Sequence, residues 1–254
     1  MLDQFARAAA LYGSENIDKL KRCRVAVFGL GGVGGNCAEA LCRSGIGAID
    51  LFDADVVEIT NINRQAVAAH STIGRDKVEV MRERLLDINP DAVITSHKIF
   101  YLPATADEVD LSVFDYIIDA VDTIAAKLEL VCRAGLLSVP VISSMGTANK
   151  FDPAAIEVAD VFNTSVCPIA RIMRGELRKR GLSALKVVYS KEKPVGQGDG
   201  AGQGDGSSVL QSRTDEPSPC PAPSPCPTLA SNAFVPPVAG LIMAAEVVRY
   251  LTSV

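Results

Sequence analysis

Few residues in this chain of 254 amino acids are suited to binding zinc or to histidine-based acid–base catalysis. The only two histidines, His70 and His97, have no sequence neighbour that would make either one a metal ligand or a general base. The seven cysteines form no Cys-x-x-Cys pair, so we do not expect a structural zinc site with four thiolates. Several instead fall in predicted core elements, where a free thiol packs as a small apolar side chain: Cys23, Cys37, Cys42 and Cys132.

The sequence also has no signal-peptide pattern, no obvious membrane span and no overall positive charge. Its first residues lack a basic start followed by an apolar core. Its most apolar stretch, residues 234–248, contains two prolines and a glutamate and is too short to cross a bilayer. We therefore expect a cytoplasmic protein without a membrane association. The net charge of −5 argues against a strongly basic nucleic-acid binder but permits local basic patches.

Apolar strand patterns alternate with helical patterns along the first part of the chain. Such alternation predicts an α/β fold of the Rossmann-like, doubly wound type, with a mostly parallel sheet and helices on both faces. Residues 3–21 are predicted to be helical, with an interruption at Gly13 and Ser14. The strands are expected at 24–28, 48–52, 92–99, 116–118 and 139–142, and the helices at 33–43, 74–88 and 125–137.

We expect a single domain over residues 1–254, because a chain of this length suits one α/β core. It divides into an N-terminal helical segment (1–22), a nucleotide-binding core (23–150) and a C-terminal α/β extension (151–254). In the extension we expect strands at 156–161 and 185–189, and helices at 167–180 and 234–251. Residues 194–228 are of low complexity, rich in glycine and proline, and predict a flexible loop over 194–230.

A glycine-rich turn follows the first predicted strand. It reads Gly29-Leu30-Gly31-Gly32-Val33-Gly34, and Asp53 comes nineteen positions after its last glycine. A strand, a glycine turn, a helix and a downstream acid are typical of a nucleotide-binding βαβ unit. The turn lets the backbone approach phosphate, and Asp53 would bind ribose hydroxyls. This pattern alone leaves open NAD, FAD, S-adenosylmethionine or an ordinary tight turn.

A second set of polar residues is not needed by a dinucleotide-binding oxidoreductase. The guanidinium fork of Arg64 is suited to binding phosphate. The alternative is an ordinary polar loop that contains one arginine. Lys77 begins a predicted helix, where a cation is disfavoured by the dipole unless an anion lies nearby; the alternative is a surface lysine. Asp55 is a weaker candidate that could equally be a solvated loop acid. The same loop carries Asn61, Asn63 and Gln65, which are further candidates for binding the nucleotide.

Two aspartates follow a buried strand, in the stretch Ile117-Ile118-Asp119-Ala120-Val121-Asp122. Carboxylates at such a strand end can hold Mg²⁺ directly or through water. For Asp119 the alternative is a helix cap.

Taken together, these motifs resemble the ubiquitin-activating-enzyme-like adenylyltransferases, a superfamily that includes the activators of the sulfur-carrier proteins of thiamine and molybdopterin synthesis. Within it, the chain is most similar to the tRNA threonylcarbamoyladenosine dehydratase family. That similarity covers nearly the whole chain except 194–230. Its further features are Arg7, Leu11-Tyr12-Gly13, Asp87-Ile88-Asn89-Pro90, Ser144-Met145-Gly146 and the stretches 158–160 and 186–190.

The resemblance implies an ATP-dependent, adenylate-forming enzyme that dehydrates threonylcarbamoyladenosine in tRNA. Gly32 and the turn would contact ATP, and Asp53 would bind its ribose. Asn61, Arg64 and Lys77 would hold the triphosphate, and Asp122 would hold Mg²⁺. Arg7 would reach into a neighbouring subunit's site, which implies a homodimer. The resemblance also suggests a sulfur-relay partner of the cysteine-desulfurase class.

Departures from the superfamily pattern keep other functions open. The sulfur-carrier activators commonly have two Cys-x-x-Cys pairs, which this chain lacks. Cys167 is the one cysteine outside the predicted core and flexible loop that could accept an acyl group, and it could equally be a buried thiol at a helix start. The alternatives are an adenylyltransferase acting on the C-terminus of a ubiquitin-like sulfur-carrier protein, an NAD-binding oxidoreductase and a non-catalytic nucleotide-binding module.

Positive charge is concentrated in residues 171–193, which hold eight Lys or Arg against two Glu. Segregated positive charge is the expected electrostatic footprint of a phosphate-backbone partner such as tRNA. The alternative is an ordinary solvated helix face. The candidate patch consists of Arg171, Arg174, Arg178, Lys179, Arg180 and Lys186.

Overall fold

The computed structural model describes residues 4–195 and 229–253, so most of the predicted flexible loop lies outside the described residues. A seven-stranded sheet has the order β3-β2-β1-β4-β5-β7-β6. Every neighbouring pair is parallel except β6 with β7. The strands are β1 (Arg24–Phe28), β2 (Ala48–Phe52), β3 (Val93–His97), β4 (Tyr116–Asp119), β5 (Val141–Ser144), β6 (Ile156–Asp160) and β7 (Lys186–Ser190).

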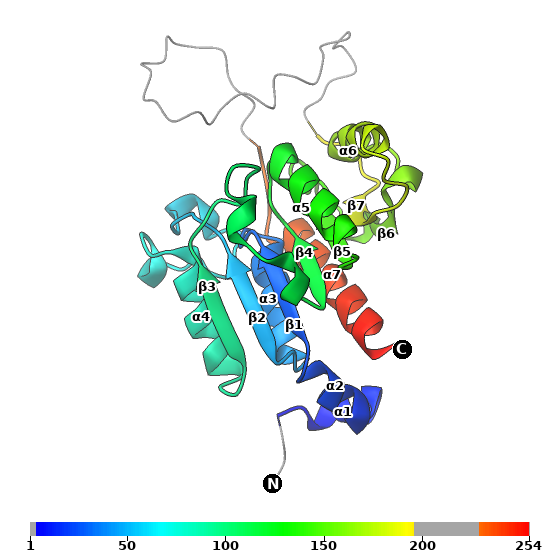
Figure 1. The fold of residues 1–254 in the computed structure, drawn as a ribbon. Coiled ribbons are helices and arrows are strands. Elements are labelled where there is room, and N and C mark those ends of the chain that lie inside the picture. Colours follow the sequence, from blue (N-terminus) through cyan, green and yellow to red (C-terminus); the bar gives the residue numbers. More distant parts are fainter. Residues whose placement is uncertain (1–3, 196–228, 254) are drawn as a thin grey trace.

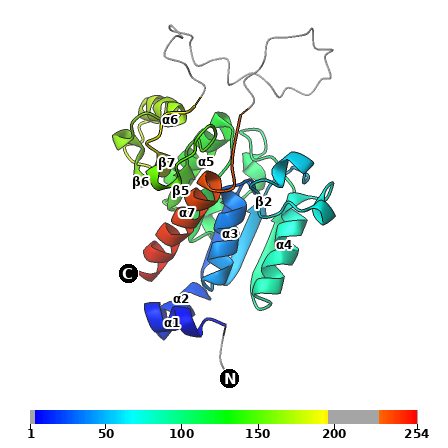
Figure 2. The same cartoon turned by 180° about the vertical axis from the view of Figure 1, so that it is seen from behind.

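Helices cover both faces of this sheet, which confirms the doubly wound α/β prediction. Figure 2 shows α3, α4 and α7 side by side on one face, and Figure 1 shows α5 on the other, next to α6. The short helices α1 and α2 lie beyond the end at which β1 begins (Figure 1). The helices are α1 (Ala6–Tyr12), α2 (Ser14–Leu20), α3 (Gly34–Arg43), α4 (Lys77–Ile88), α5 (Ile124–Leu136), α6 (Pro168–Lys179) and α7 (Val235–Thr252).

The predicted elements are present, with differences at their ends. Helix α4 begins at Lys77 rather than Gly74, because Gly74 has a positive φ of 83° and its N–H donates to Val57 O at 2.8 Å. That bond ties residue 74 to the preceding loop instead of to a helix. Strand β5 begins two residues later than expected, at Val141. Pro236 and Pro237 lie in the first turn of α7, where the missing N–H of proline costs nothing.

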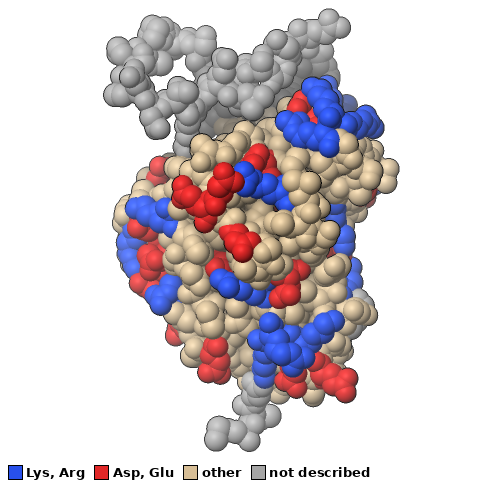
Figure 3. All heavy atoms as spheres, viewed as in Figure 1, with Lys and Arg blue, Asp and Glu red and all other residues tan. Residues whose placement is uncertain are grey.

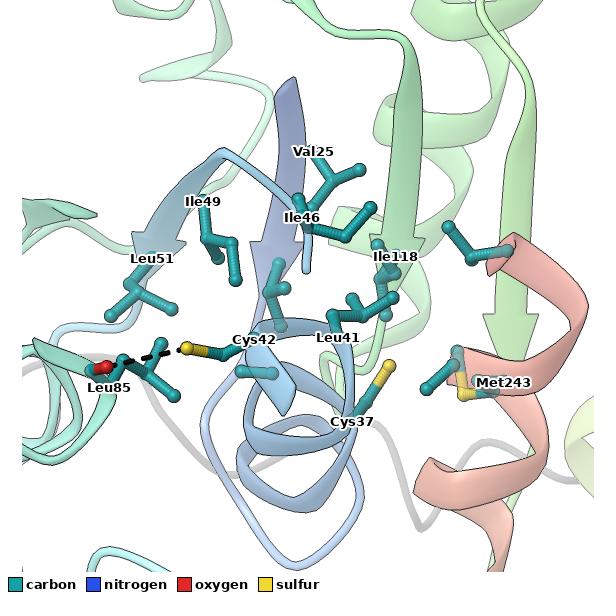
Figure 4. Packing of buried hydrophobic residues seen from close by; sticks show 14 of the residues in the cluster. Val25, Cys37, Leu41, Cys42, Ile46, Ile49, Leu51, Leu85, Ile118 and Met243 are labelled. Carbon is teal, nitrogen blue, oxygen red and sulfur yellow. Dashed lines mark hydrogen bonds between the residues drawn. The ribbon is translucent and has the colours of Figure 1, made fainter. Parts of the chain in front are cut away.

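The larger core lies between the sheet and the layer of α3, α4 and α7. Figure 4 shows Leu41, Cys37 and Cys42 of α3 facing Ile49 and Leu51 of β2 and Met243 of α7. The Cys42 thiol donates to Leu85 O at 3.3 Å, and burial raises the pKa of this thiol to about 11. These cysteines therefore pack as neutral apolar groups, as the sequence predicts.

Helix α7 is longer than the apolar stretch recognised in the sequence. Among the described helices it alone is long and apolar enough to cross a membrane by length and composition, and 56% of it is buried inside the fold. Its apolar residues are used in packing against α3, α2 and the sheet. This packing accounts for its composition.

The contact between α3 and α7 depends on a glycine. A Cβ placed on Gly240 would lie 2.2 Å from Val33 O and 3.0 Å from Cys37 N, and both of these atoms belong to the backbone of the facing segment. Since backbone cannot move aside as a side chain can, the two helices approach this closely only because residue 240 has no side chain.

We expect Gly240→Ala to lower the free energy of unfolding by about 1–3 kcal/mol, as overpacking typically does. Gly175→Ala is the matched control, because Gly175 lies in α6 with nothing within 4 Å of an added Cβ. There the higher helix propensity of alanine should stabilise the protein by about 0.5–1 kcal/mol. Urea denaturation of both variants measures the difference; equal stabilities would contradict the packing argument.

Candidate functional site

The glycine turn lies where the parallel strands end, and two of its glycines are required by the protein's own backbone. Gly29 follows β1 with φ of 88°, and its N–H donates to Phe52 O at 2.8 Å. A Cβ on Gly29 would lie 2.6 Å from Ala120 O, and one on Gly34 would lie 1.8 Å from Gly29 O. Any side chain at either position would therefore displace the turn from β4 or from α3.

The other two glycines of the turn face different surroundings. A Cβ on Gly31 would meet no protein atom within 4 Å, so nothing in the fold itself requires glycine there. Open space over this backbone, next to the amino-terminal end of α3, suits the close approach of a phosphate. A Cβ on Gly32 would meet Pro236 at 2.9 Å and Arg64 Cγ at 3.3 Å, so Arg64 and the start of α7 lie over the turn.

Asp53 lies beside the glycine turn, as the sequence predicts. Its two carboxylate oxygens accept the N–H of Leu30 at 2.7 Å and the N–H of Asp55 at 2.8 Å. Burial raises the pKa of this carboxyl, while the nearby Lys77 ammonium and both N–H groups act in the opposite direction. Each oxygen keeps a lone pair for a further donor such as a ribose hydroxyl.

Lys77 is paired with Asp55. The Lys77 ammonium donates to Asp55 Oδ2 at 2.8 Å, and the residue is only 5% exposed. The alternative of a surface lysine is therefore wrong. The anion expected near this helix start is present within the chain itself, as Asp55, and Asp55 is not simply a solvated loop acid.

Arg64 carries a charge without a carboxylate partner in the described part of the chain. Its Nη1 donates to Thr60 O at 3.1 Å and to Asn63 Oδ1 at 2.9 Å, both neutral acceptors. The other end of the Asn63 amide donates to Ser231 O at 3.0 Å. Asn63 is thus occupied in holding Arg64 to the segment that precedes α7.

The remaining two polar residues of this loop are buried. Asn61 is 7% exposed, and its Oδ1 accepts the N–H of Glu58 at 3.1 Å, which closes the short 3-10 turn Ile59–Asn61. Gln65 is 8% exposed, and its buried Oε1 has no hydrogen-bond partner among the described residues. A buried acceptor without a donor is costly, and a ligand or water that donates to it would remove that cost.

Asp119 lies in the interior of the fold. It is fully buried, and its carboxylate accepts from Lys127 Nζ at 3.1 and 3.2 Å and from Ser143 Oγ at 2.5 Å. It also accepts the Val121 N–H at 3.3 Å. Because its oxygens are used inside the fold, the expectation that Asp119 holds the Mg²⁺ of a bound nucleotide is not supported. Neither does it cap α5, whose N-cap residue is Thr123.

Sequence reasoning missed Lys127. This lysine is 2% exposed, which is rare for an ammonium group without a buried partner. The available signal was its position in the predicted helix, since it falls on the same apolar stripe as Ile124 and Val131. A lysine on such a stripe indicates a buried acidic partner.

Asp122 is exposed, in the turn between β4 and α5, and has no ion pair in the described ranges. This turn lies against Gly29 through Ala120, so the carboxylate is carried by a segment that contacts the glycine turn. A single free carboxylate fits Mg²⁺, which proteins commonly bind through one or two carboxylates together with substrate phosphates.

Arg7 lies away from the residues just described. It is exposed on α1, and the α1–α2 segment packs where the strands begin: the Phe5 ring lies 3.5 Å from a Cβ placed on Gly45, and Gly47 N donates to Leu20 O at 3.1 Å. The glycine turn is at the opposite edge of the sheet. Within one chain, therefore, the structure does not bring Arg7 to Arg64.

Lys and Arg side chains gather over α6, at the upper right of Figure 3. Three of the six residues of the predicted patch pair with carboxylates, and two others contact neutral groups. Glu176 pairs with Lys179 and Arg180, and Lys186 pairs with Glu246 of α7 at 3.0 Å. Arg174 donates to Thr164, and the Arg178 guanidinium lies 5.2 Å from the Phe162 ring centre. Arg171 is exposed and has no ion pair among the described residues. The one carboxylate from outside residues 171–193 that pairs with the patch in the described part of the chain is Glu246.

Cys167 is 2% exposed at the start of α6 and packs in a cluster with Met145, Met173 and Leu177. This placement favours the interpretation as a buried thiol over that of an acyl acceptor.

We expect Lys127→Met to lower the free energy of unfolding by about 3–5 kcal/mol, because it leaves the Asp119 charge buried and unpaired. The double variant Lys127→Met with Asp119→Asn removes both charges and should recover part of the loss. Chemical denaturation of the three proteins checks this. A single variant as stable as the wild type would contradict the ion pair.

The chain matches the ThiF family over residues 5–254. It is 42% identical over 252 residues to the tRNA threonylcarbamoyladenosine dehydratase of Bacillus subtilis, covering 99% of this chain and 95% of the relative. The solved structure of the Escherichia coli tRNA N6-threonylcarbamoyladenosine dehydratase with ATP matches with a TM-score of 0.81 and 28% identity, over 98% of this chain and 94% of that one. The Escherichia coli molybdopterin-synthase adenylyltransferase is 32% identical, but over 50% of this chain and 50% of its own length. The chain belongs to the ThiF family.

Proposed function

We propose that this protein uses ATP to dehydrate threonylcarbamoyladenosine in tRNA, closing a ring through an acyl-adenylate intermediate. The observation that carries the proposal is Arg64, whose guanidinium has no described carboxylate partner and whose Cγ lies 3.3 Å from a Cβ placed on Gly32 of the glycine turn. The full-length similarity to relatives named as tRNA threonylcarbamoyladenosine dehydratases selects this substrate over a carrier-protein terminus.

In the proposed complex, different residues at the carboxyl ends of the strands bind different parts of the nucleotide. The turn Gly29–Gly34 lies along the phosphates, with Gly31 leaving the space that they need. Asp53 accepts from ribose hydroxyls, and Gln65 Oε1 accepts from a donor of the bound ligand. Asn61 and Lys77 lie beside the triphosphate with Arg64, whereas Asn63 and Asp55 act by holding Arg64 and Lys77.

The chemistry begins when a substrate carboxylate oxygen attacks the α-phosphorus of ATP. A new oxygen–phosphorus bond forms, and pyrophosphate leaves with the electrons of the bond that breaks. Arg64 and Lys77 stabilise the negative charge that develops on the phosphate oxygens. The ureido nitrogen of the same substrate then attacks the activated carbonyl, loses its proton, and AMP leaves. Since this step is intramolecular, proximity favours it and no nucleophile from the protein is required.

Mg²⁺ would be held by Asp122, and when bound it supplies positive charge that neutralises the phosphates. A homodimer would bring Arg7 of one chain to the nucleotide site of the other, which explains why Arg7 lies at the opposite edge of its own sheet. We further propose a cytoplasmic protein in which the described residues form one domain around a single sheet.

Gly31→Ala tests the nucleotide site separately from the fold. Because an added Cβ meets no protein atom, stability should change by less than about 0.5 kcal/mol. The methyl group would fill the phosphate space, so ATP affinity should fall by about tenfold or more, which is about 1.4 kcal/mol. The rise in melting temperature caused by ATP should shrink accordingly, while Gly175→Ala keeps it. An undiminished rise in melting temperature would mean that the bound nucleotide does not lie against Gly31.

The proposed reaction is tested by mass analysis of nucleosides from tRNA that carries threonylcarbamoyladenosine, after incubation with Mg-ATP and digestion that preserves the ring. We expect the loss of one water, dependent on ATP. Arg64→Ala should slow it on the order of 10²–10³-fold, and Arg82→Ala on α4 should not. Arg7→Ala and Arg64→Ala chains should recover activity when mixed, because one intact shared site forms. No mass change with the wild type, together with pyrophosphate exchange on a carrier protein, would favour the sulfur-carrier activator instead.

A further inference from the structure

Two phenylalanines are largely exposed close to the site. Phe151, after β5, is 70% exposed, and Phe234, directly before α7, is 63% exposed. Four other phenylalanines, by contrast, are at least 94% buried: Phe5, Phe28, Phe52 and Phe114. A single exposed ring is ordinary, but two on neighbouring segments can form the apolar part of a binding surface.

The backbones that carry the two rings are joined by hydrogen bonds. Asn149 N donates to Ala230 O at 2.8 Å, and Ala230 N donates to Asn149 Oδ1 at 2.8 Å. Asn232 Nδ2 donates to Lys150 O at 2.8 Å. These bonds form a two-segment clasp of residues 149–151 and 230–234, which places residues far apart in the sequence side by side.

The backbone N–H of each phenylalanine is also held by a hydrogen bond. The Phe151 N–H donates to Glu192 Oε1 at 2.9 Å, and the Phe234 N–H donates to Asn232 Oδ1 at 2.9 Å. The backbone that carries the two rings is thus ordered before binding. Ordering such a surface before binding lowers the entropy cost of binding.

The clasp is connected directly to the proposed reaction site. Ser231 accepts from Asn63, which in turn holds Arg64. Pro236, two residues after Phe234, lies over Gly32 of the glycine turn. A ligand that covers the exposed rings would therefore lie next to the proposed nucleotide site.

Charges of both signs lie next to Phe151: the Asp152 carboxylate accepts the N–H of Ala154, and one cation there is left without an ion pair among the described residues. Lys193 is exposed, has no ion pair among the described residues, and directly follows the Glu192 that holds Phe151. Glu192 itself is occupied by the N–H groups of Phe151 and Asp152. An aromatic surface with a free cation beside it is the combination by which proteins bind single-stranded nucleic acid.

We propose that Phe151 and Phe234 form a stacking surface for unpaired bases of the tRNA loop that carries the modified adenosine. This inference rests on the proposed function. An enzyme that modifies a base must reach it outside a helix, and the unstacked neighbours of that base then need new surfaces to stack on. The two rings offer such surfaces beside the reaction site, and Lys193 contacts the phosphates between those bases.

The test measures binding of a fluorescent RNA hairpin whose loop carries threonylcarbamoyladenosine, by anisotropy over a series of salt concentrations with the full chain. Phe151→Ala and Phe234→Ala should each weaken binding by about tenfold without changing the salt dependence, because stacking releases no counterions. Lys193→Ala should instead lower the slope of log K against log salt by about one. Phe234→Trp should keep the affinity, and Leu136→Ala, at an 86% exposed position on α5, is the matched control.

The readouts separate this surface from the proposed reaction. ATP should raise the melting temperature of every variant equally, which shows that each is folded and that its nucleotide site is intact. If the wild type dehydrates the hairpin and the alanine variants bind it as tightly as the wild type, the stacking surface is wrong and the reaction stands. If the wild type neither binds nor dehydrates it, both proposals are wrong. A tenfold loss that appears equally in Leu136→Ala would also overturn the assignment.

Discussion

The contact between Gly29 and Ala120 is the constraint on which the site depends. Adjacent parallel strands β1 and β4 end at the same edge, and the turns that follow them touch without an intervening side chain. One of these turns presents backbone to phosphate, and the other carries Asp122. Because this contact is backbone against backbone, neither turn can shift without the other, and the two ends of the proposed nucleotide site keep a fixed distance.

The buried ion pair of Lys127 and Asp119 holds the same region from the interior of the fold. A buried ion pair is seldom a net source of stability, since desolvation offsets most of its attraction. Its position suggests another use: Asp119 is the last residue of β4, and its carboxylate accepts the N–H of Val121 in the turn that carries Asp122. Lys127 joins α5 to this carboxylate, so we interpret the pair as a device that orders the turn. A hydrophobic pair of similar volume would pack equally well but could not accept that N–H.

The sequence predicts those features that depend on local patterns and fails where a partner comes from elsewhere in the chain. The glycine turn, Asp53 and the strand ends follow from periodicity and turn chemistry, and they lie where expected. The roles of Asp119 and Lys77 could not be predicted in this way, because their partners, Lys127 and Asp55, become neighbours only when helices pack on the sheet. The pairing of Lys186 in the candidate basic patch could not be predicted for the same reason: its partner Glu246 lies far along the chain.

The distribution of paired and unpaired charge gives the proposed nucleotide one orientation. Asp53 lies at the end of β2 without an ion pair among the described residues, and its carboxylate suits hydroxyl donors. Arg64, held only by neutral oxygens among the described residues, keeps its full positive charge in the loop that contacts Gly32. A nucleotide bound the other way round would place phosphates against Asp53 and leave Arg64 without an anion. The loop that carries Arg64 is also bonded to the clasp, because Asn63 donates to Ser231 O. The proposed phosphate-binding residue and the proposed RNA surface are therefore held by one connected set of hydrogen bonds.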